Sequence, residues 1–438
     1  MSHSTPTRQT PAATRRSLLE DLRSGKVPTQ GLLEICVGRD REKAALFESV
    51  KSAVGGGYTF RVIAGQYGSG KTFLVELMRA VARGNKAKML TMKGELSPDK
   101  LLVGGRAQRD DLWQDLIGSL TAVDDGEPGE GQLVLVLNAF AAEVEKQARS
   151  EVLGQSHLVV ADELLSPIRL LTQGAAFAEV VRLYVKASYD GDATMRQHVL
   201  TWLTGGFTTS MEARRSVKMG RFEAGLTDRL RLLAALARCA GWNGLFVCID
   251  EMDKLLKLPK AQCQTNLMEI HRLVDLNAKR APGLAVFLSG APGFVDDPRR
   301  GLFSSEPIKQ RLSSNPWASP TAEVPLVDYR SPVLRLESLT PTESRALLHK
   351  IREVFAAIHP TLTNSRLPEA AIDAYLRHCQ LLIGAETHLR PRNTIRSFVG
   401  LLDILDQNPH TTWHDLLKNV RVDHDSGESG IHDDYRIS

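Results

Sequence analysis

Long apolar runs are missing from this sequence, and so is an apolar leader at its N-terminus. Spanning a bilayer takes roughly 18 to 20 consecutive apolar residues, and no stretch approaches that length. The first residues, "MSHSTPTRQTPAATRRS", lack the apolar middle of a secretory signal peptide. These absences exclude a membrane-spanning chain, and we expect a cytoplasmic protein with no membrane partner.

Cysteine and net charge are also scarce. The five cysteines form no CxxC pair, which argues against a disulfide framework and against a zinc site. The 55 lysines and arginines against 51 aspartates and glutamates leave a formal net charge of +4, so the composition does not demand a polyanionic partner. Aromatic residues make up only 6% of the chain and hydrophobic residues 42%, a balance typical of a globular protein with two or three domains.

Five short apolar runs, rich in β-branched residues, are spread along the chain, and a helical pattern follows each of them. Buried strands that alternate with helices are typical of an α/β fold, in which helices wrap a parallel sheet. The connections are expected to be right-handed crossovers. The runs occupy residues 59–64, 88–92, 245–250, 284–289 and 332–339.

Two helical regions complete the predicted organisation. Between the second and third runs, apolar residues recur at spacings of three and four, which predicts a large helical insertion at about 95–240. A second helical block follows the fifth run. We therefore expect an N-terminal extension, a sheet domain that contains the insertion, a helical lid and a frayed tail, with these bounds: 1–30, 31–339, 340–425 and 426–438.

The stretch "GQYGSGKT" stands between the first apolar run and the helical pattern "FLVELMRAVA". It matches the phosphate-binding pattern G-x-x-x-x-G-K-[ST] in the strand-to-helix context that the mechanism requires. Backbone N–H groups of such a loop face the phosphates, the lysine reaches the β and γ phosphates, and the final hydroxyl ligates Mg²⁺. The sequence thus predicts a site for ATP and Mg²⁺ at Gly65, Gly68, Ser69, Gly70, Lys71 and Thr72.

Two acidic residues close the third run, "GLFVCIDE". Asp250 is expected to hold Mg²⁺ through water, and Glu251 to orient and polarise the water that attacks the γ-phosphate. Asp253, two residues further on, is expected to be a helix-capping or surface residue. On its own the acidic stretch would be read as a solvated loop, but together with the glycine-rich motif the catalytic interpretation is favoured.

Three further residues are weaker candidates. Ser289 ends the fourth run, where a hydroxyl can contact the γ-phosphate or the attacking water, although many such serines only form turns. Arg311 precedes the fifth run and Arg392 starts a helix in the last block. Either arginine could stabilise transition-state charge, while the alternative for each is a solvated side chain or one paired with an acid.

In this order the motifs resemble those of the AAA+ ATPases, within the branch of replication-initiator-like and signal-transduction ATPases. The match begins with "VGRDRE" and ends with "RPRNTIRSFVGLL". More narrowly, "AGQYGSGKT", the "GELSP" after the second run, the helical insertion and "LRPRNTIRSFVGLLD" look like the ATP-binding protein of bacteriophage-exclusion (BREX) defence systems. The resemblance covers residues from about 15 to 420.

The resemblance implies specific roles. Lys71 and Thr72 take the first-motif roles and Asp250 and Glu251 the second, while Ser289 corresponds to the first sensor, Arg311 to the arginine finger and Arg392 to the second sensor. Many relatives have Asn or Thr at the first sensor, and serine has a shorter reach. The implied partners are ATP, other defence-system proteins and, in a nucleotide-dependent homo-oligomer, further copies of the chain.

Two functions fit this pattern. One is an ATPase whose hydrolysis cycle remodels or loads a partner, either protein or DNA, in anti-phage defence. The other is a slow nucleotide-dependent switch or assembly platform that is controlled by ATP binding. Glu251 and the arginine finger favour the first, and the long insertion favours the second. A metabolite kinase is disfavoured because no second phosphate site is visible. DNA stays open as a partner. The best candidates for phosphate contacts are the basic stretches 212–221 and 228–238, although solvated helix faces are the favoured explanation of both.

Overall fold

The computed structural model describes residues 11–103, 111–122, 130–150, 156–277, 279, 281–313, 315–318, 326–360, 366–383 and 391–419. They form two compact units. The larger unit contains the described parts of 39–66 and 71–337, and the smaller unit those of 1–38, 67–70 and 338–438. The predicted tail, 426–438, lies outside the described residues. None of the helices in the described ranges is both long and apolar enough to cross a membrane.

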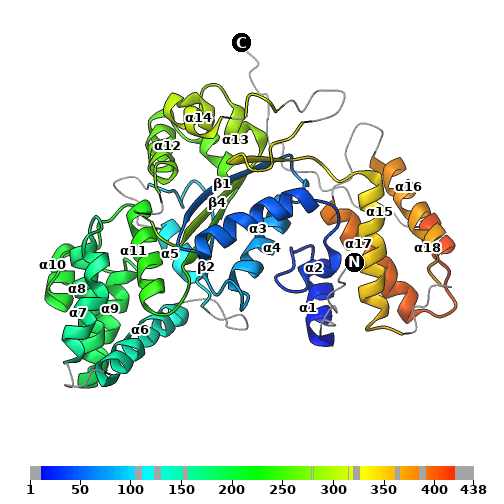
Figure 1. Ribbon diagram of the computed structural model, residues 1–438. Helices are drawn as coiled ribbons and strands as arrows, with labels where there is room; N and C mark the ends of the chain where they lie inside the picture. Colours follow the sequence, from blue (N-terminus) through cyan, green and yellow to red (C-terminus); the bar gives the residue numbers. More distant parts are fainter. Residues whose placement is uncertain are drawn as a thin grey trace, which may run out of the picture. The chain divides into compact units, whose positions relative to one another are not determined.

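A five-stranded parallel sheet forms the centre of the larger unit (Figure 1), in the order β2-β3-β4-β1-β5. Every residue of β3 and β4 is buried, as expected for central strands that are covered on both faces. These features confirm the predicted fold class, an α/β P-loop NTPase-like sheet wrapped by helices. The strands are β1 (Tyr58–Gly65), β2 (Leu90–Glu95), β3 (Leu245–Asp250), β4 (Leu284–Gly290) and β5 (Val333–Leu336).

The register of the sheet determines which residues gather at its carboxyl edge. Asp250, the last residue of β3, is aligned with Glu95 at the end of β2. In β4, Leu288 is aligned with Ile249 of β3, and Ser289 is aligned with Ile63 of β1. Ligands of open α/β sheets bind outside this edge, so the polar residues that end β3 and β4 lie where a ligand is expected.

Helices cover both faces of the sheet. In Figure 1, α3 and α4 lie on one side of it, and α12, α13 and α14 on the other. Helix α4 follows β1 after the glycine-rich loop, and its residues 74–79 are all buried, so the middle of the helix is covered on every side. The helices around the sheet are α3 (Asp40–Val54), α4 (Lys71–Arg83), α12 (Lys260–Val274), α13 (Pro292–Asp296), α14 (Glu306–Leu312) and the 3₁₀ turns η1 (Met252–Lys257) and η2 (Leu302–Ser304).

The chain between β2 and β3 is helical wherever it has regular structure in the described residues. Its helices α6 to α10 lie together at one side of the sheet (Figure 1). The seven helices described in this insertion are α5 (Asp111–Gly118), α6 (Glu130–Ser150), α7 (His157–Arg169), α8 (Gly174–Asp190), α9 (Ala193–Leu203), α10 (Ser210–Val217) and α11 (Leu226–Cys239).

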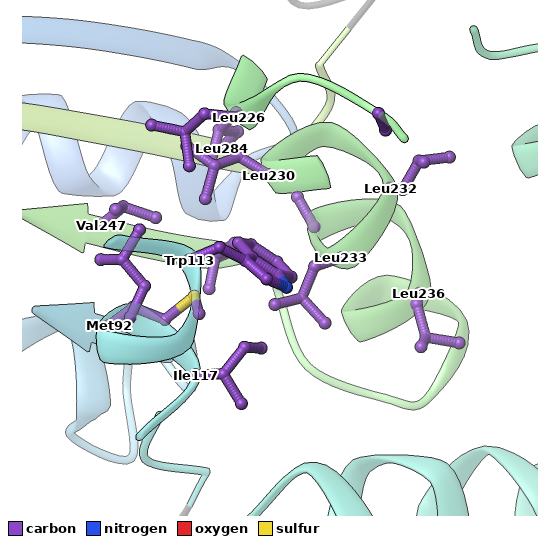
Figure 2. Packing of buried hydrophobic residues seen from close by; sticks show 14 of the residues in the cluster. Met92, Trp113, Ile117, Leu226, Leu230, Leu232, Leu233, Leu236, Val247 and Leu284 are labelled. Atoms are coloured by element: carbon purple, nitrogen blue, oxygen red, sulfur yellow. The ribbon is translucent and has the colours of Figure 1, made fainter. Parts of the chain in front are cut away.

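One hydrophobic core joins the insertion to the sheet (Figure 2). Trp113 of α5 is 5% exposed and lies among Met92 of β2, Val247 of β3 and Leu230 of α11. Its indole N–H donates to the carbonyl of Leu203 at 3.0 Å, so the polar atom of the ring is satisfied although it is buried. The insertion is therefore packed as part of the same body as the sheet.

The smaller unit consists of helices. Thr340 and Glu343 form a reciprocal capping box at the start of α15, which explains why that helix begins there. Arg23 of α1 makes a two-pronged ion pair with Asp403 of α17, with both N–O distances at 2.8 Å, and this pair joins the N-terminal helix to the C-terminal block. The helices are α1 (Ala12–Arg23), α2 (Leu32–Ile35), α15 (Pro341–Ala356), α16 (Glu369–Ile383), α17 (Pro391–Gln407) and α18 (Trp413–Asn419).

Candidate nucleotide site

The glycine-rich loop connects β1, which ends at Gly65, to α4, which begins at Lys71. Gly68 and Gly70 have φ angles of +85° and +86°. An added Cβ at Gly70 would meet no atom within 4 Å, so the left-handed backbone, and not lack of space, is what requires glycine there. Ser69, between these two glycines, is buried. Left-handed residues of this kind are typical of anion-binding loops, in which successive N–H groups face the anion.

The side chain of Lys71 contacts the backbone of the loop that precedes it. Its ammonium donates to the carbonyl oxygens of Gly65 at 2.8 Å and Gln66 at 3.0 Å. Burial lowers the pKa of Lys71, while the carboxylates of Asp250, Asp253 and Glu251 act in the opposite direction. The side chain is thus a charged donor held at the loop by two neutral acceptors, which an anionic phosphate can replace with a stronger hydrogen bond.

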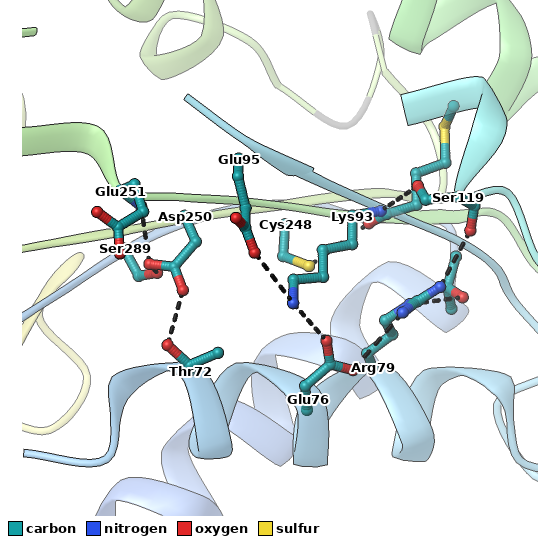
Figure 3. Close-up of polar contacts among 12 residues, drawn as sticks. Thr72, Glu76, Arg79, Lys93, Glu95, Ser119, Cys248, Asp250, Glu251 and Ser289 are labelled. Atoms are coloured by element: carbon teal, nitrogen blue, oxygen red, sulfur yellow. Dashed lines mark hydrogen bonds and ion pairs between the residues drawn. The ribbon is translucent and has the colours of Figure 1, made fainter. Parts of the chain in front are cut away.

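Asp250 is the point where three elements meet (Figure 3). Its carboxylate is buried at the end of β3. Oδ2 accepts a hydrogen bond from the Thr72 hydroxyl of α4 at 2.8 Å. Oδ1 accepts from the backbone N–H of Glu251 at 2.8 Å and from the hydroxyl of Ser289 in β4. The structure therefore brings together four of the predicted residues, Lys71, Thr72, Asp250 and Ser289, with Glu251 adjacent in sequence.

The oxygen atoms of Thr72 and Asp250 fit a magnesium ion better than a structural metal. In the described residues, no group of three or more His, Cys, Asp or Glu side chains could hold a metal ion. A hydroxyl and one carboxylate, 2.8 Å apart, supply two hard oxygen donors and a single negative charge. Mg²⁺ keeps several waters and is bound through one or two carboxylates plus substrate phosphates, so this pair has the chemistry that such a site requires of a protein.

Glu251 has an unusual backbone. Its φ of +60° is in the left-handed region, which non-glycine residues seldom adopt outside turns and functional sites. The half-exposed carboxylate lies 3.6 Å from the ammonium of Lys254, three residues further along. The strand thus ends abruptly at Asp250, and the next side chain leaves the direction that a continued strand would have given it.

Asp253 has a role that the sequence did not suggest. We expected a helix-capping or surface residue, but its Oδ1 accepts a hydrogen bond at 2.9 Å from the backbone N–H of Ala291, just after β4. It therefore connects the chain after β3 to the chain after β4. The sequence shows a carboxylate three residues after Asp250, but no feature near it indicates that Ala291 is its partner.

A buried ionic network lies beside the site on the same side of α4 (Figure 3). Glu76 and Arg79 follow Thr72 at helical spacing, and both are buried. The Lys93 ammonium of β2 lies 3.1 Å from Glu76 and 3.5 Å from Glu95. Burial lowers the pKa of Lys93, but the carboxylates of Glu76 and Glu95 raise it by more. This network could not be predicted from the sequence, because α4 and β2 supply its members and their pairing depends on the fold.

The two arginine candidates are placed differently. Arg311 is exposed on α14, where it forms an ion pair with Asp275 and donates to the carbonyl of Pro307 at 3.2 Å. These contacts do not include any residue of the Thr72, Asp250 and Ser289 cluster. Arg392 is exposed on α17 of the smaller unit. The roles of Arg311 as a finger and Arg392 as a second sensor therefore stay predictions.

Comparison with known protein families gives a match over most of the chain. A family model described as "BREX system ATP-binding protein BrxC/D" matches residues 10–421, which is most of the chain. No curated protein sequence matches the chain.

Proposed function

Since this chain belongs to the BREX system ATP-binding protein BrxC/D family, we propose that it binds ATP with Mg²⁺, hydrolyses it, and uses the cycle to remodel or load a partner in anti-phage defence. ATP binding is the activity that the family description carries. Hydrolysis, the metal and the partner are the proposed steps, and they are supported by the arrangement of the side chains.

The observation that carries the proposal is the hydrogen bond between Thr72 and Asp250. These residues are 178 positions apart in the sequence, yet their oxygen atoms lie 2.8 Å apart. A glycine-rich turn alone binds an anion, and an acidic strand end alone is a solvated loop. Their meeting supports a site that can hold phosphates and a cation together, as phosphoryl transfer requires.

Each residue then has a defined task. Lys71 holds the β and γ phosphates, and Thr72 and Asp250 hold Mg²⁺, which would neutralise charge on the phosphate oxygens. Glu251 orients a water and accepts its proton as the water oxygen bonds to the γ-phosphorus. The bond from that phosphorus to the bridging oxygen breaks, and ADP leaves with the electron pair. Ser289 keeps the Asp250 carboxylate in place by donating to it.

Two variants test the site. We expect Lys71→Ala to abolish the thermal stabilisation by Mg·ATP, which for the wild type amounts to about 2.7 kcal/mol at 100 times Kd. Glu251→Gln keeps the size and hydrogen-bonding capacity of the side chain, so ATP should still bind while turnover falls roughly 10²-fold or more. Equal stabilisation of the wild type and Lys71→Ala would refute the site. Undiminished turnover in Glu251→Gln would move the base elsewhere.

A slow switch is the second candidate, and one observation favours it. The Glu251 carboxylate that should orient water is 3.6 Å from the Lys254 ammonium, which competes for it. In a switch, ATP binding would control assembly of a defence complex and turnover would be incidental. Steady-state turnover measured over a range of protein concentrations, with and without duplex DNA, separates the two. Stimulation supports the remodelling ATPase, and a slow rate that no condition changes supports the switch.

A further inference from the structure

Helix α10 has two chemically opposite sides. Ala213 and Val217 are buried, one turn apart. Successive residues of a helix are about 100° apart, so Met211 and Arg215 point away from that buried pair and Arg214 lies at its flank. Lys218 caps the helix on the same outward side, and all four of these side chains are exposed. We call Arg214, Arg215 and Lys218 the α10 basic cluster.

Among the described residues, the three cations of the α10 basic cluster have no acidic partner. Residues 193–221 contain five arginines and lysines but one acid, Glu212, whereas the whole chain has a formal net charge of only +4. The Glu212 carboxylate accepts hydrogen bonds from the backbone N–H of Thr208 at 3.2 Å and its hydroxyl at 2.9 Å, which lower its pKa. In the described chain, neither hydrogen bonds nor ion pairs occupy the charged groups of the cluster.

Several other cations on the surface of the insertion are paired with acids, although the exposed Lys186 of α8 has no such partner in the described residues. On α6, Lys146 lies 3.2 Å from Glu143, and Arg149 pairs with Glu145. Arg182 of α8 lies 3.1 Å from Asp162 of α7. A helix surface made only for solubility gains from interspersed acids at these spacings. The exposed acid of α10, Glu212, accepts hydrogen bonds from Thr208, so the three cations of the cluster keep their positive charge available.

We propose that the α10 basic cluster binds the backbone phosphates of a nucleic acid duplex. Phosphate contacts need charge and fork-shaped donors, which the guanidinium groups of Arg214 and Arg215 supply, and they need no apolar centre. An acidic protein would be expected to find apolar anchors as well, yet the outward side of α10 offers one, Met211, at 64% exposure. In Figure 1, α10 lies at the end of the insertion away from the sheet. The proposal goes beyond nucleotide binding and does not depend on it.

The test compares two triple variants that remove the same charge. Arg214→Gln, Arg215→Gln and Lys218→Gln together neutralise the cluster, whose exposed side chains leave the fold intact. The control carries Lys51→Gln, Lys146→Gln and Arg149→Gln, three cations of the larger unit whose side chains are 76–77% exposed but are paired with acids. Binding of a fluorescein-labelled DNA duplex of mixed sequence is followed by anisotropy over a range of salt concentrations.

We expect the wild type and the control to bind with similar affinity and salt dependence. Each lost phosphate contact lowers the slope of log affinity against log salt by about 0.9, so the cluster variant should be shallower by up to about 2.7 and bind on the order of a hundredfold more weakly at 0.1 M salt. Equal loss in both variants would mean a general effect of net charge and would overturn the proposal. So would a wild type that does not bind the duplex.

Two further arms separate the alternatives. If polyglutamate competes as well as the duplex at equal charge concentration, the surface fits an acidic protein and the proposal is wrong. Thermal stabilisation by Mg·ATP should be the same in the cluster variant and the wild type. If Mg·ATP does not stabilise the wild type, the proposed nucleotide site is wrong but the cluster is unaffected. If the two triple variants bind the duplex equally well, the proposal for the cluster is wrong but the nucleotide site is unaffected.

Discussion

Replacing Ser289 by alanine tests whether this residue acts through Asp250. The side chain is 1% exposed, and its hydroxyl donates to Oδ1 of the Asp250 carboxylate. A hydrogen bond to a charged group contributes about 1.5–3 kcal/mol. Oδ1 keeps its second donor, the Glu251 N–H at 2.8 Å, and Oδ2 keeps Thr72. We therefore expect Ser289→Ala to lower the free energy of unfolding by about 1.5–2 kcal/mol, the lower part of that range.

Equilibrium unfolding in urea, followed by tryptophan fluorescence, measures this loss. The control is Ser304→Ala, because the Ser304 hydroxyl donates to a neutral acceptor, the carbonyl of Gly301, at 2.7 Å. That bond contributes about 0.5–1 kcal/mol. A double-mutant cycle of Ser289→Ala with Asp250→Asn should give a coupling energy of about 1 kcal/mol. If Ser289→Ala costs no more than the control and the coupling is zero, the hydroxyl does not act through Asp250.

Three further predictions concern the site. Because the pKa of Lys71 is lowered in the folded protein, its charge weakens folding at neutral pH, and this penalty disappears as the pH rises through the folded pKa towards 10.5. ATP affinity should meanwhile begin to fall at a lower pH than for an unperturbed lysine, and a Lys71→Arg variant that binds ATP should not show this early fall. Lys254→Ala should raise turnover by no more than about fivefold, since an exposed pair such as Glu251–Lys254 contributes about 0–1 kcal/mol; a decrease would mean that Lys254 itself assists the reaction. Arg311→Ala should bind ATP but hydrolyse it roughly 10³-fold more slowly. If Arg311 completes the site of a neighbouring copy, mixing this variant with Lys71→Ala should restore part of the rate. A mixture that stays inactive argues against action between copies.

The fold class could be predicted because its signals are local. The run at 245–250 coincides with β3, and the run at 284–289 falls one residue short of the end of β4. Such strands are buried on both faces, so nearly every residue is apolar and the run is visible without knowledge of its neighbours. The order of the strands was not predictable in this way. The placement of β4 between β3 and β1 depends on which surfaces pack together, and no single stretch of sequence carries that information.

In the candidate site, too, the features with a local sequence signal could be predicted and the contacts set by packing could not. The glycine-rich loop, Thr72 and Asp250 were predictable because each type of residue is required by the chemistry of phosphate and cation binding. The hydrogen bond from Ser289 to Asp250 was not, since serine at a strand end has several common uses. For Arg311 the sequence pattern left open the pairing with an acid, and the structure shows that partner to be Asp275. A long side chain finds its partner only after the helices around it are in place.

The strand order also has a consequence for how the protein is made. β1 pairs with β4 and β5, and β2 pairs with β3, so neither of the first two strands has a neighbour in the sheet until much later in the chain. The carbonyl of Met92 in β2, for example, contacts the thiol of Cys248 in β3, which is 156 residues further along the chain. At about 5–20 residues per second on the ribosome, β2 stays unpaired for roughly 8 to 30 seconds. β1 stays unpaired for roughly 11 to 45 seconds, because Leu284 of β4 lies 226 residues after its partner Tyr58. During that interval the nascent chain is exposed to mispairing with other chains, and we expect its yield to depend more on chaperones and growth temperature than the stability of the finished fold would suggest.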